Sequence, residues 1–150
     1  MCIRDRLGVL IGDHLMATTS GAGRLVATTV VSSSMLSALA EWYGVAYVET
    51  LTGFKWIARA ALLRPGHSLL FGYEEALGYA VSTVVADKDG LSAALVVADM
   101  AARANHEGGS LLDRLDTLEA LVGVHSTAQW SLRLPGSDAM EVMALSLIHI

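Results

Sequence analysis

Residues 25–49 have the sequence LVATTVVSSSMLSALAEWYGVAYVE, and this stretch decides the fold. Residues 25–31 are apolar or β-branched throughout, which is typical of a strand buried on both faces. The serines at 32–34 can cap a helix over residues 35–43, which Gly44 ends. Residues 45–49 predict a second strand. A strand, a helix and another strand in succession favour a layered α/β fold.

The same alternation continues on both sides of this stretch. We expect a helix over residues 7–18, a helix over 53–63 that Thr52 caps, strands over 68–73 and 81–85, helices over 91–104 and 110–121, and a strand over 125–134. The expected fold is therefore an α/β domain in which a mixed sheet is flanked by helices.

Polar motifs fall where such a fold places its ligands. They are TGFK at 52–55, after the second strand, GYEE at 72–75, after the third strand, and DKDG at 87–90, before a long helix. In open α/β sheets, ligands bind outside the carboxyl ends of the strands. The three motifs are therefore expected at one edge of the sheet.

Two pairs of charged residues stand out in these motifs. Lys55 and Lys88 are the only lysines of the chain, and each lies beside the start of an expected helix, where a phosphate would be welcome. Glu74 and Glu75 are adjacent carboxylates that can accept hydrogen bonds from sugar hydroxyls or serve in acid–base chemistry. On placement alone, solvation by water explains the lysines equally well and explains the glutamates better.

Composition excludes several classes of protein. The net charge is -5 and the lysines and arginines do not cluster, so we expect no nucleic-acid partner. A single cysteine cannot form a disulfide within the chain, which favours the cytoplasm. The apolar runs, such as residues 91–98, are too short to span a membrane.

The DKDG motif does not form a calcium loop. Such a loop needs glycine at its sixth position and glutamate at its twelfth, and here Ser92 and Ala98 occupy them. Capping of the following helix by Asp87 or Asp89 is the simpler interpretation. The histidines are scattered without the spacing of a metal site.

Taken together, the motifs resemble a known family. The segments ETLTGFKWI (49–57), FGYEEALGY (71–79) and DKDG (87–90), in this order and spacing, resemble the third domain of the α-D-phosphohexomutases, the phosphoglucomutase/phosphomannomutase superfamily. The resemblance is strongest to the branch with phosphopentomutase and glucose-1,6-bisphosphate synthase. It covers residues 7 to about 134.

The resemblance implies a function for the parent protein. Family members are isomerases of four domains that interconvert sugar 1-phosphates and 5- or 6-phosphates through a bisphosphate intermediate. A phosphoserine in domain one transfers the phosphoryl group, aspartates of domain two hold Mg²⁺, and domain four clamps the other phosphate. Domain three recognises the sugar through a Gly-Glu-x-Ser-Gly loop.

The resemblance also implies roles for the residues of the motifs. Lys88 matches a lysine near the reacting groups and is the expected catalytic residue, in proton transfer or charge stabilisation. The expected substrate-binding residues are Glu74, Glu75, Thr52, Gly53, Phe54 and Lys55. Ala76 stands where most families have the loop serine, so the sugar stays open between hexose, pentose and bisphosphate.

The ends of the chain differ from the rest. Residues 1–6 and 146–150 resemble translated sequencing-adapter tails and are expected to be non-native. Residues 7–104 are then domain three, and residues 105–145 supply a helix and a strand leading toward domain four. On this interpretation the chain is a fragment without domains one, two and four. It holds no metal ligands and is inactive by itself.

Two alternatives remain open from the sequence. The chain could be a stand-alone module that binds sugar phosphates, or an α/β interaction domain without catalysis whose polar motifs are solvated.

Overall fold

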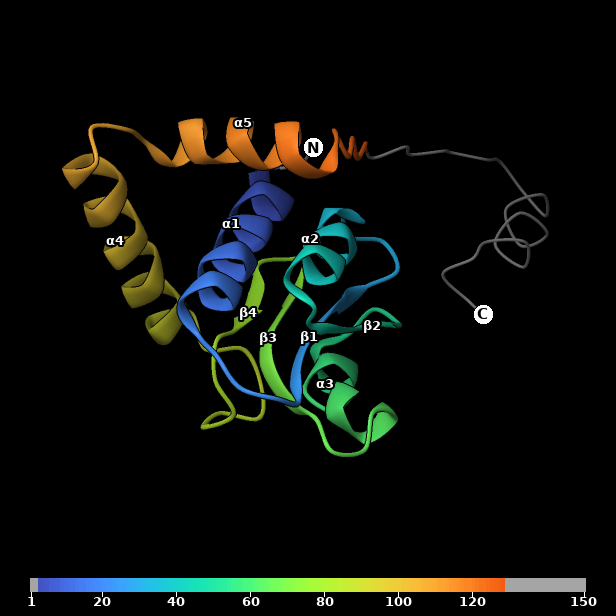
Figure 1. Ribbon diagram of the computed structural model, residues 1–150. Coiled ribbons are helices and arrows are strands. Elements are labelled where there is room, and N and C mark those ends of the chain that lie inside the picture. The colour runs from blue at the N-terminus through green and yellow to red at the C-terminus, as the bar shows by residue number, and fades with distance from the viewer. Residues whose placement is uncertain (1–2, 129–150) are drawn as a thin grey trace, which may run out of the picture.

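A mixed sheet forms the centre of the molecule. The computed structural model describes residues 3–128, and its sheet has the order β2-β1-β3-β4 (Figure 1). Strands β1 (Arg24–Thr29), β2 (Ala46–Thr50) and β3 (Ser68–Glu74) are parallel to one another, and β4 (Gly78–Ala80) is antiparallel to β3. The expected α/β fold with a mixed sheet and flanking helices is therefore confirmed.

Helices cover both faces of the sheet. On one face lie α1 (Ile3–Thr18) and α2 (Met35–Tyr43), and on the other lie the short helix α3 (Phe54–Ile57) and a 3₁₀ turn (Ala60–Leu63). Strand β1 contributes to both layers, because Val26 packs with α1 and α2 whereas Leu25 and Ala27 pack with α3. This explains the uninterrupted apolar sequence of the central strand.

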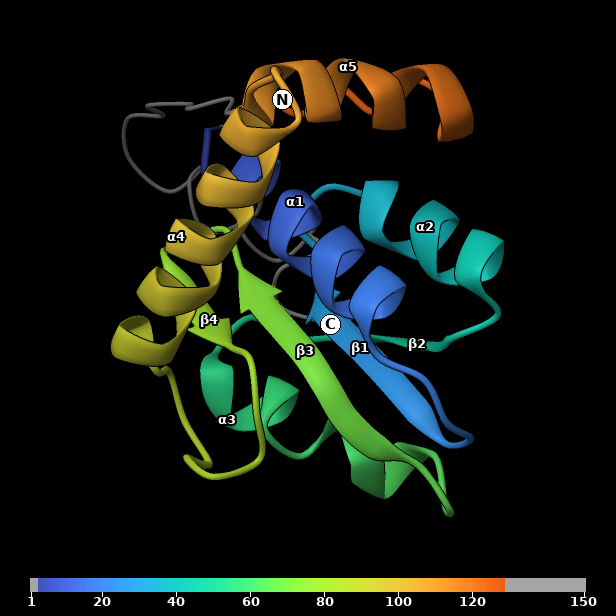
Figure 2. The ribbon, with the colours of Figure 1, turned by 60° about the vertical axis from the view of Figure 1, so that its left-hand side comes forward.

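Two further helices complete the layer on the α1 side. Helix α4 (Gly90–His106) packs against β4 and α1, and α5 (Leu111–Val122) contacts α1, α2 and α4 (Figure 2). Their starts are capped as helix starts usually are: Asp89 accepts a hydrogen bond from the Ser92 amide, and Ser110 forms a capping box with Asp113. None of the described helices is long and apolar enough to cross a bilayer.

Two expected elements differ from the structure. The expected helix over residues 53–63 is broken into α3 and the 3₁₀ turn, and its N-cap is Gly53, so Thr52 provides no side-chain cap. The expected strand over 81–85 is wrong. The last strand within residues 3–128 is β4 at 78–80, because the expected loop at 74–79 is instead a hairpin with only residues 75–77 in its turn.

The ends of the described region bear on the expected boundaries. Residues 3–6 form the first turn of α1, and the buried Asp5 accepts hydrogen bonds from the Ser33 amide and the Tyr73 hydroxyl. That residues 1–6 are non-native stays a prediction. Residues 125–128 are not in a strand, and the rest of the expected strand over 125–134 lies outside the described residues, as does the tail at 146–150.

Candidate functional site

The carboxyl ends of β1, β2 and β3 lie at one edge of the sheet because these strands are parallel. Thr29 pairs with Thr50 across β1 and β2, and Thr28 pairs with Tyr73 across β1 and β3. The TGFK motif leaves this edge after β2, and the GYEE motif ends β3 there. The parallel register of the strands therefore brings these two motifs to the same edge of the sheet, as expected.

Glu74 lies at the end of β3 and is enclosed by its neighbours. It pairs with Gly78 across the hairpin and is only 7% exposed. A Cβ atom added to Gly78 would lie 2.8 Å from Glu74 Cγ and 2.8 Å from Phe54 Cδ2, so the glutamate side chain and the ring both approach the glycine. The carboxylate accepts no hydrogen bond from another described residue, and because none of the buried side-chain oxygens in the described part lacks a partner, its oxygens reach the solvent. Its acceptor capacity is therefore available to a ligand.

Lys88 reaches the same group of residues from the start of α4. Its ammonium nitrogen lies 4.9 Å from the centroid of the Phe54 ring, within the range of a cation–π interaction. It also lies 3.0 Å from Asp87 Oδ1, and both side chains are largely exposed. The amide of Asp89 donates to the Tyr79 carbonyl, which ties this loop to β4. Phe54 thus approaches both Lys88 and Gly78, the hairpin partner of Glu74.

The other residues of the TGFK motif make different contacts. Lys55 is exposed and its ammonium nitrogen lies 5.3 Å from the centroid of the neighbouring Trp56 ring. Thr52 is exposed as well, and Gly53 adopts a φ of 115°, which favours glycine. Within the described residues, neither Lys55 nor Thr52 forms a hydrogen bond or ion pair with Glu74 or Lys88. Their expected part in substrate binding stays a prediction.

Glu75 faces a different part of the edge from Glu74. Its carboxylate oxygen Oε2 lies 3.0 Å from Thr29 Oγ1 and 3.3 Å from Ser32 Oγ, and these hydroxyls lie 2.8 Å apart. Its carbonyl oxygen accepts a hydrogen bond from Arg4. The sequence reasoning missed Thr29 and assigned Ser32 only to capping. Small hydroxyl residues at the carboxyl end of a buried strand were the signal that could have found them.

Metal-ligating side chains do not cluster in the described part of the chain. It contains no group of three or more histidine, cysteine, aspartate or glutamate side chains that could hold a metal ion. That the Mg²⁺ ligands lie outside this domain stays a prediction.

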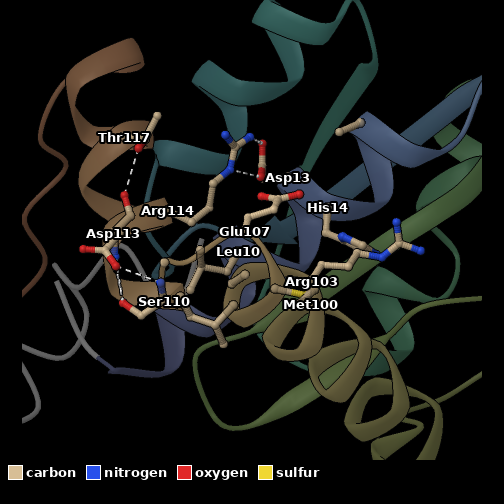
Figure 3. Close-up of a pocket in the computed structure, with 14 residues that line it drawn as sticks. Leu10, Asp13, His14, Met100, Arg103, Glu107, Ser110, Asp113, Arg114 and Thr117 are labelled. Carbon is tan, nitrogen blue, oxygen red and sulfur yellow. Dashed lines mark hydrogen bonds and ion pairs between the residues drawn. The ribbon is translucent and has the colours of Figure 1, made fainter.

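A cavity of about 400 Å³ lies between α1, α4 and α5, away from the residues discussed above (Figure 3). Its charged groups satisfy one another. Asp13 receives two hydrogen bonds from Arg114, at 2.9 and 2.8 Å, and one from the Tyr43 hydroxyl at 2.7 Å. On the α4 side, Asp99 pairs with Arg103 and with His14. This arrangement fastens α5 to the rest of the domain.

The ionisation of the Tyr43 hydroxyl provides a test of its hydrogen bond to Asp13. Burial, followed by the hydrogen bond to Asp13 and the charge of Asp13, raises the pKa of Tyr43 to about 12. An unperturbed tyrosine ionises near pH 10. Tyr43 therefore contributes stability that is fully present below about pH 10 and is lost as the pH rises toward 12.

We expect ultraviolet titration of tyrosinate to detect this late ionisation. The difference between the wild-type and Tyr43→Phe curves isolates the Tyr43 step, which should lie near pH 12. Asp13→Asn should move the step toward lower pH, because it removes the carboxylate charge while burial remains. A Tyr43 step near pH 10 in the wild-type chain would contradict the hydrogen bond to Asp13.

Comparison with known proteins identifies the domain. A sequence model described as phosphoglucomutase/phosphomannomutase, α/β/α domain III, matches residues 4–118. The chain belongs to this family. As a domain III, it is similar over 137 residues, at 37% identity, to a Haemophilus influenzae protein named "Probable phosphomannomutase". It is also 43% identical over 99 residues to mouse glucose 1,6-bisphosphate synthase. The family resemblance inferred from the motifs is confirmed.

The match to each relative covers only part of that relative. Domain III spans 27% of the Haemophilus protein and 16% of the mouse protein, while the matches take in 91% and 65% of this chain. Among solved structures, the open form of parafusin, a Paramecium phosphoglucomutase, superposes with a TM-score of 0.64 over 83% of this chain and 21% of its own. At 22% identity, this likeness shows the fold alone.

Proposed function

We propose that this domain III is the sugar-recognition part of a cytoplasmic phosphosugar mutase. The parent enzyme would be an isomerase that interconverts a sugar 1-phosphate and the corresponding 5- or 6-phosphate through a bisphosphate. The observation that supports the proposal most directly is the Glu74 carboxylate. Glu74 is 7% exposed, its carboxylate accepts no hydrogen bond from another described residue, and its side chain approaches Gly78 together with the Phe54 ring, over which Lys88 lies.

Each of these residues has a chemical task in the proposal. Glu74 accepts hydrogen bonds from hydroxyl groups of the sugar ring and so fixes the orientation of the sugar. Lys88 brings a positive charge beside the sugar, where it can stabilise a phosphate or pass a proton. Phe54 holds the lysine ammonium group over its ring. Phosphoryl transfer depends mainly on positioning and charge stabilisation, so these tasks are the ones a recognition domain must supply.

The remaining parts of the reaction are assigned elsewhere. We place the phosphoserine and the Mg²⁺ ligands in the portions of the relatives that lie outside the matched span, and we expect no turnover from this chain alone. Mg²⁺ would supply charge stabilisation to the transferred phosphoryl group. Ala76, which lacks a hydroxyl, leaves glucose phosphates, pentose phosphates and the bisphosphate as substrates to be compared.

A chimeric enzyme tests the proposal. Residues 4–118 replace the matching segment of the Haemophilus influenzae relative, and turnover is assayed with glucose 1-phosphate, mannose 1-phosphate and ribose 1-phosphate. We expect mutase turnover with at least one of them and a large loss in the Glu74→Ala chimera. A folded chimera that turns over none of these sugars, or that is indifferent to Glu74→Ala, would contradict the proposal. Turnover by the isolated chain would refute the expectation that it is inactive.

A further inference from the structure

The two adjacent glutamates of the hairpin have different surroundings. Glu74 packs against Phe54 and Gly78, on the α3 side of the sheet. The Glu75 carboxylate instead meets Thr29, at the end of β1, and Ser32, just before α2. Glu74 is the last residue of β3 whereas Glu75 is the first residue of the turn, and the two carboxylates have separate hydrogen-bonding environments.

Thr29, Ser32 and Glu75 form a connected group, here named the Glu75 clasp. Two hydroxyl protons serve three oxygen–oxygen contacts, so one contact lacks a proton at any moment. The two shorter contacts are Ser32 to Thr29 at 2.8 Å and Thr29 to Glu75 at 3.0 Å. The arrangement that fits them has Ser32 donate to Thr29 and Thr29 donate to the Glu75 carboxylate. Thr29 is fully buried, which shields this chain of hydrogen bonds from water.

The turn that the clasp holds is a strained one. It spans residues 75–77, and Leu77 adopts a φ of 67°, in the left-handed region that side chains other than glycine rarely adopt. The Leu77 side chain is largely exposed, so little packing of its own maintains this conformation. The hydrogen bond between Glu75 and Thr29, at the end of β1, restrains the turn instead.

We propose that Glu75 is a positioning residue, and that Thr29 and Ser32 hold its carboxylate so that the 75–77 turn presents Glu74 to the sugar. Glu75 itself then makes no contact with the substrate. This inference rests on the proposed function, because the purpose of the clasp is to order a sugar-binding loop. Both Thr29 and Ser32 become part of the recognition apparatus, acting through Glu75.

A double-mutant cycle on the full chain tests this role. The dissociation constant for glucose 1,6-bisphosphate is measured by calorimetry for Thr29→Val, Ser32→Ala, Glu75→Ala and the Thr29→Val/Glu75→Ala double variant. Each single change should weaken binding by about threefold to tenfold, the cost of ordering a loosened loop. The double variant should bind no more weakly than its weaker parent, because both changes remove the same tie. Thr29→Ser, which keeps the hydroxyl, should restore wild-type binding.

A Thr29 side chain that acts independently of Glu75 predicts another pattern. The effects of Thr29→Val and Glu75→Ala would then multiply in the double variant, and Thr29→Ser would differ little from Thr29→Val. Either result would overturn the clasp as the device that positions the loop. Urea midpoints of all variants establish that the compared proteins are folded.

Amide spectra without ligand separate the clasp from the proposed function. In the free chain, Thr29→Val and Glu75→Ala should displace the amide signals of Ala76 and Leu77 in the same direction, and Thr29→Ser should not. Unchanged signals in both variants would overturn the clasp whether or not the sugar binds. Failure of the wild-type chain to bind the bisphosphate would instead contradict the proposed function, and displaced loop signals would still support the clasp.

Discussion

Glu74→Ala should weaken the binding of glucose 1,6-bisphosphate to the chain by about tenfold to a hundredfold. Glu74 is 7% exposed and its carboxylate accepts no hydrogen bond from another described residue, so its oxygens, which reach the solvent, can accept hydrogen bonds from sugar hydroxyls. Hydrogen bonds to charged groups are worth about 1.5–3 kcal/mol, which corresponds to this loss. Calorimetric titration of wild type and variant measures it directly.

Two further variants make the Glu74 result specific. Glu74→Gln keeps the size of the side chain that packs against Phe54 and Gly78, and should lose affinity without loss of stability. Glu49→Gln removes an exposed carboxylate near the end of β2, at the same sheet edge, and should leave affinity unchanged. Equal losses in Glu49→Gln and Glu74→Ala would point to a general effect of charge and contradict a sugar contact at Glu74.

Asp13→Ala should lower the free energy of unfolding by about 2–3 kcal/mol. Asp13 is 3% exposed and accepts hydrogen bonds from Arg114 and Tyr43, so its removal leaves partners on α5 and α2 unsatisfied. The Arg114 side chain is 41% exposed and its charge can reach water, which keeps the loss below that of a fully buried ion pair. Urea denaturation measures the change.

Asp116→Ala is the matched control for Asp13→Ala. Asp116 lies on α5 but is exposed, and its removal should change stability by less than about 0.5 kcal/mol. Hydrogen exchange should also show faster exchange of α5 amides in Asp13→Ala than in wild type. If Asp13→Ala were as harmless as Asp116→Ala, the ion pair with Arg114 would not be what fastens α5.

Capping residues and glycines in the sequence correctly predicted where two of the helices begin or end. The helix expected at 35–43 has the bounds of α2, because Gly44 ends it in a left-handed conformation with φ of 62°. The start of α4 followed from Asp89 in the same way. The strand expected at 81–85 failed because a β-branched sequence favours a strand only where a neighbouring strand is available to pair with it. Here the chain pairs with β3 only over residues 78–80, opposite residues 72–74, and residues 81–85 have no strand partner.

In the candidate site as well, the sequence predicted what depends on neighbouring residues and missed contacts between residues far apart in the chain. The rule for parallel strands predicted that Glu74 and Lys88 would lie at one edge of the sheet. The structure agrees with this prediction, because the Phe54 ring approaches both Lys88 and Gly78, which pairs with Glu74. The environment of Glu75 did not follow, because Thr29 and Ser32 are 46 and 43 residues away in the sequence. The bond between Asp13 and Arg114 joins residues 101 apart, and no local pattern marks it.

The central claim is that the edge formed by Glu74, Phe54 and Lys88 receives a phosphosugar. Titration of the isotopically labelled wild-type chain with glucose 1,6-bisphosphate, followed through its backbone amide signals, tests this claim most directly. The account predicts saturable shifts at Glu74, Ala76 and Lys88. Saturation without any response at these three residues, or shifts confined to the residues around the α1–α4–α5 cavity, would contradict it.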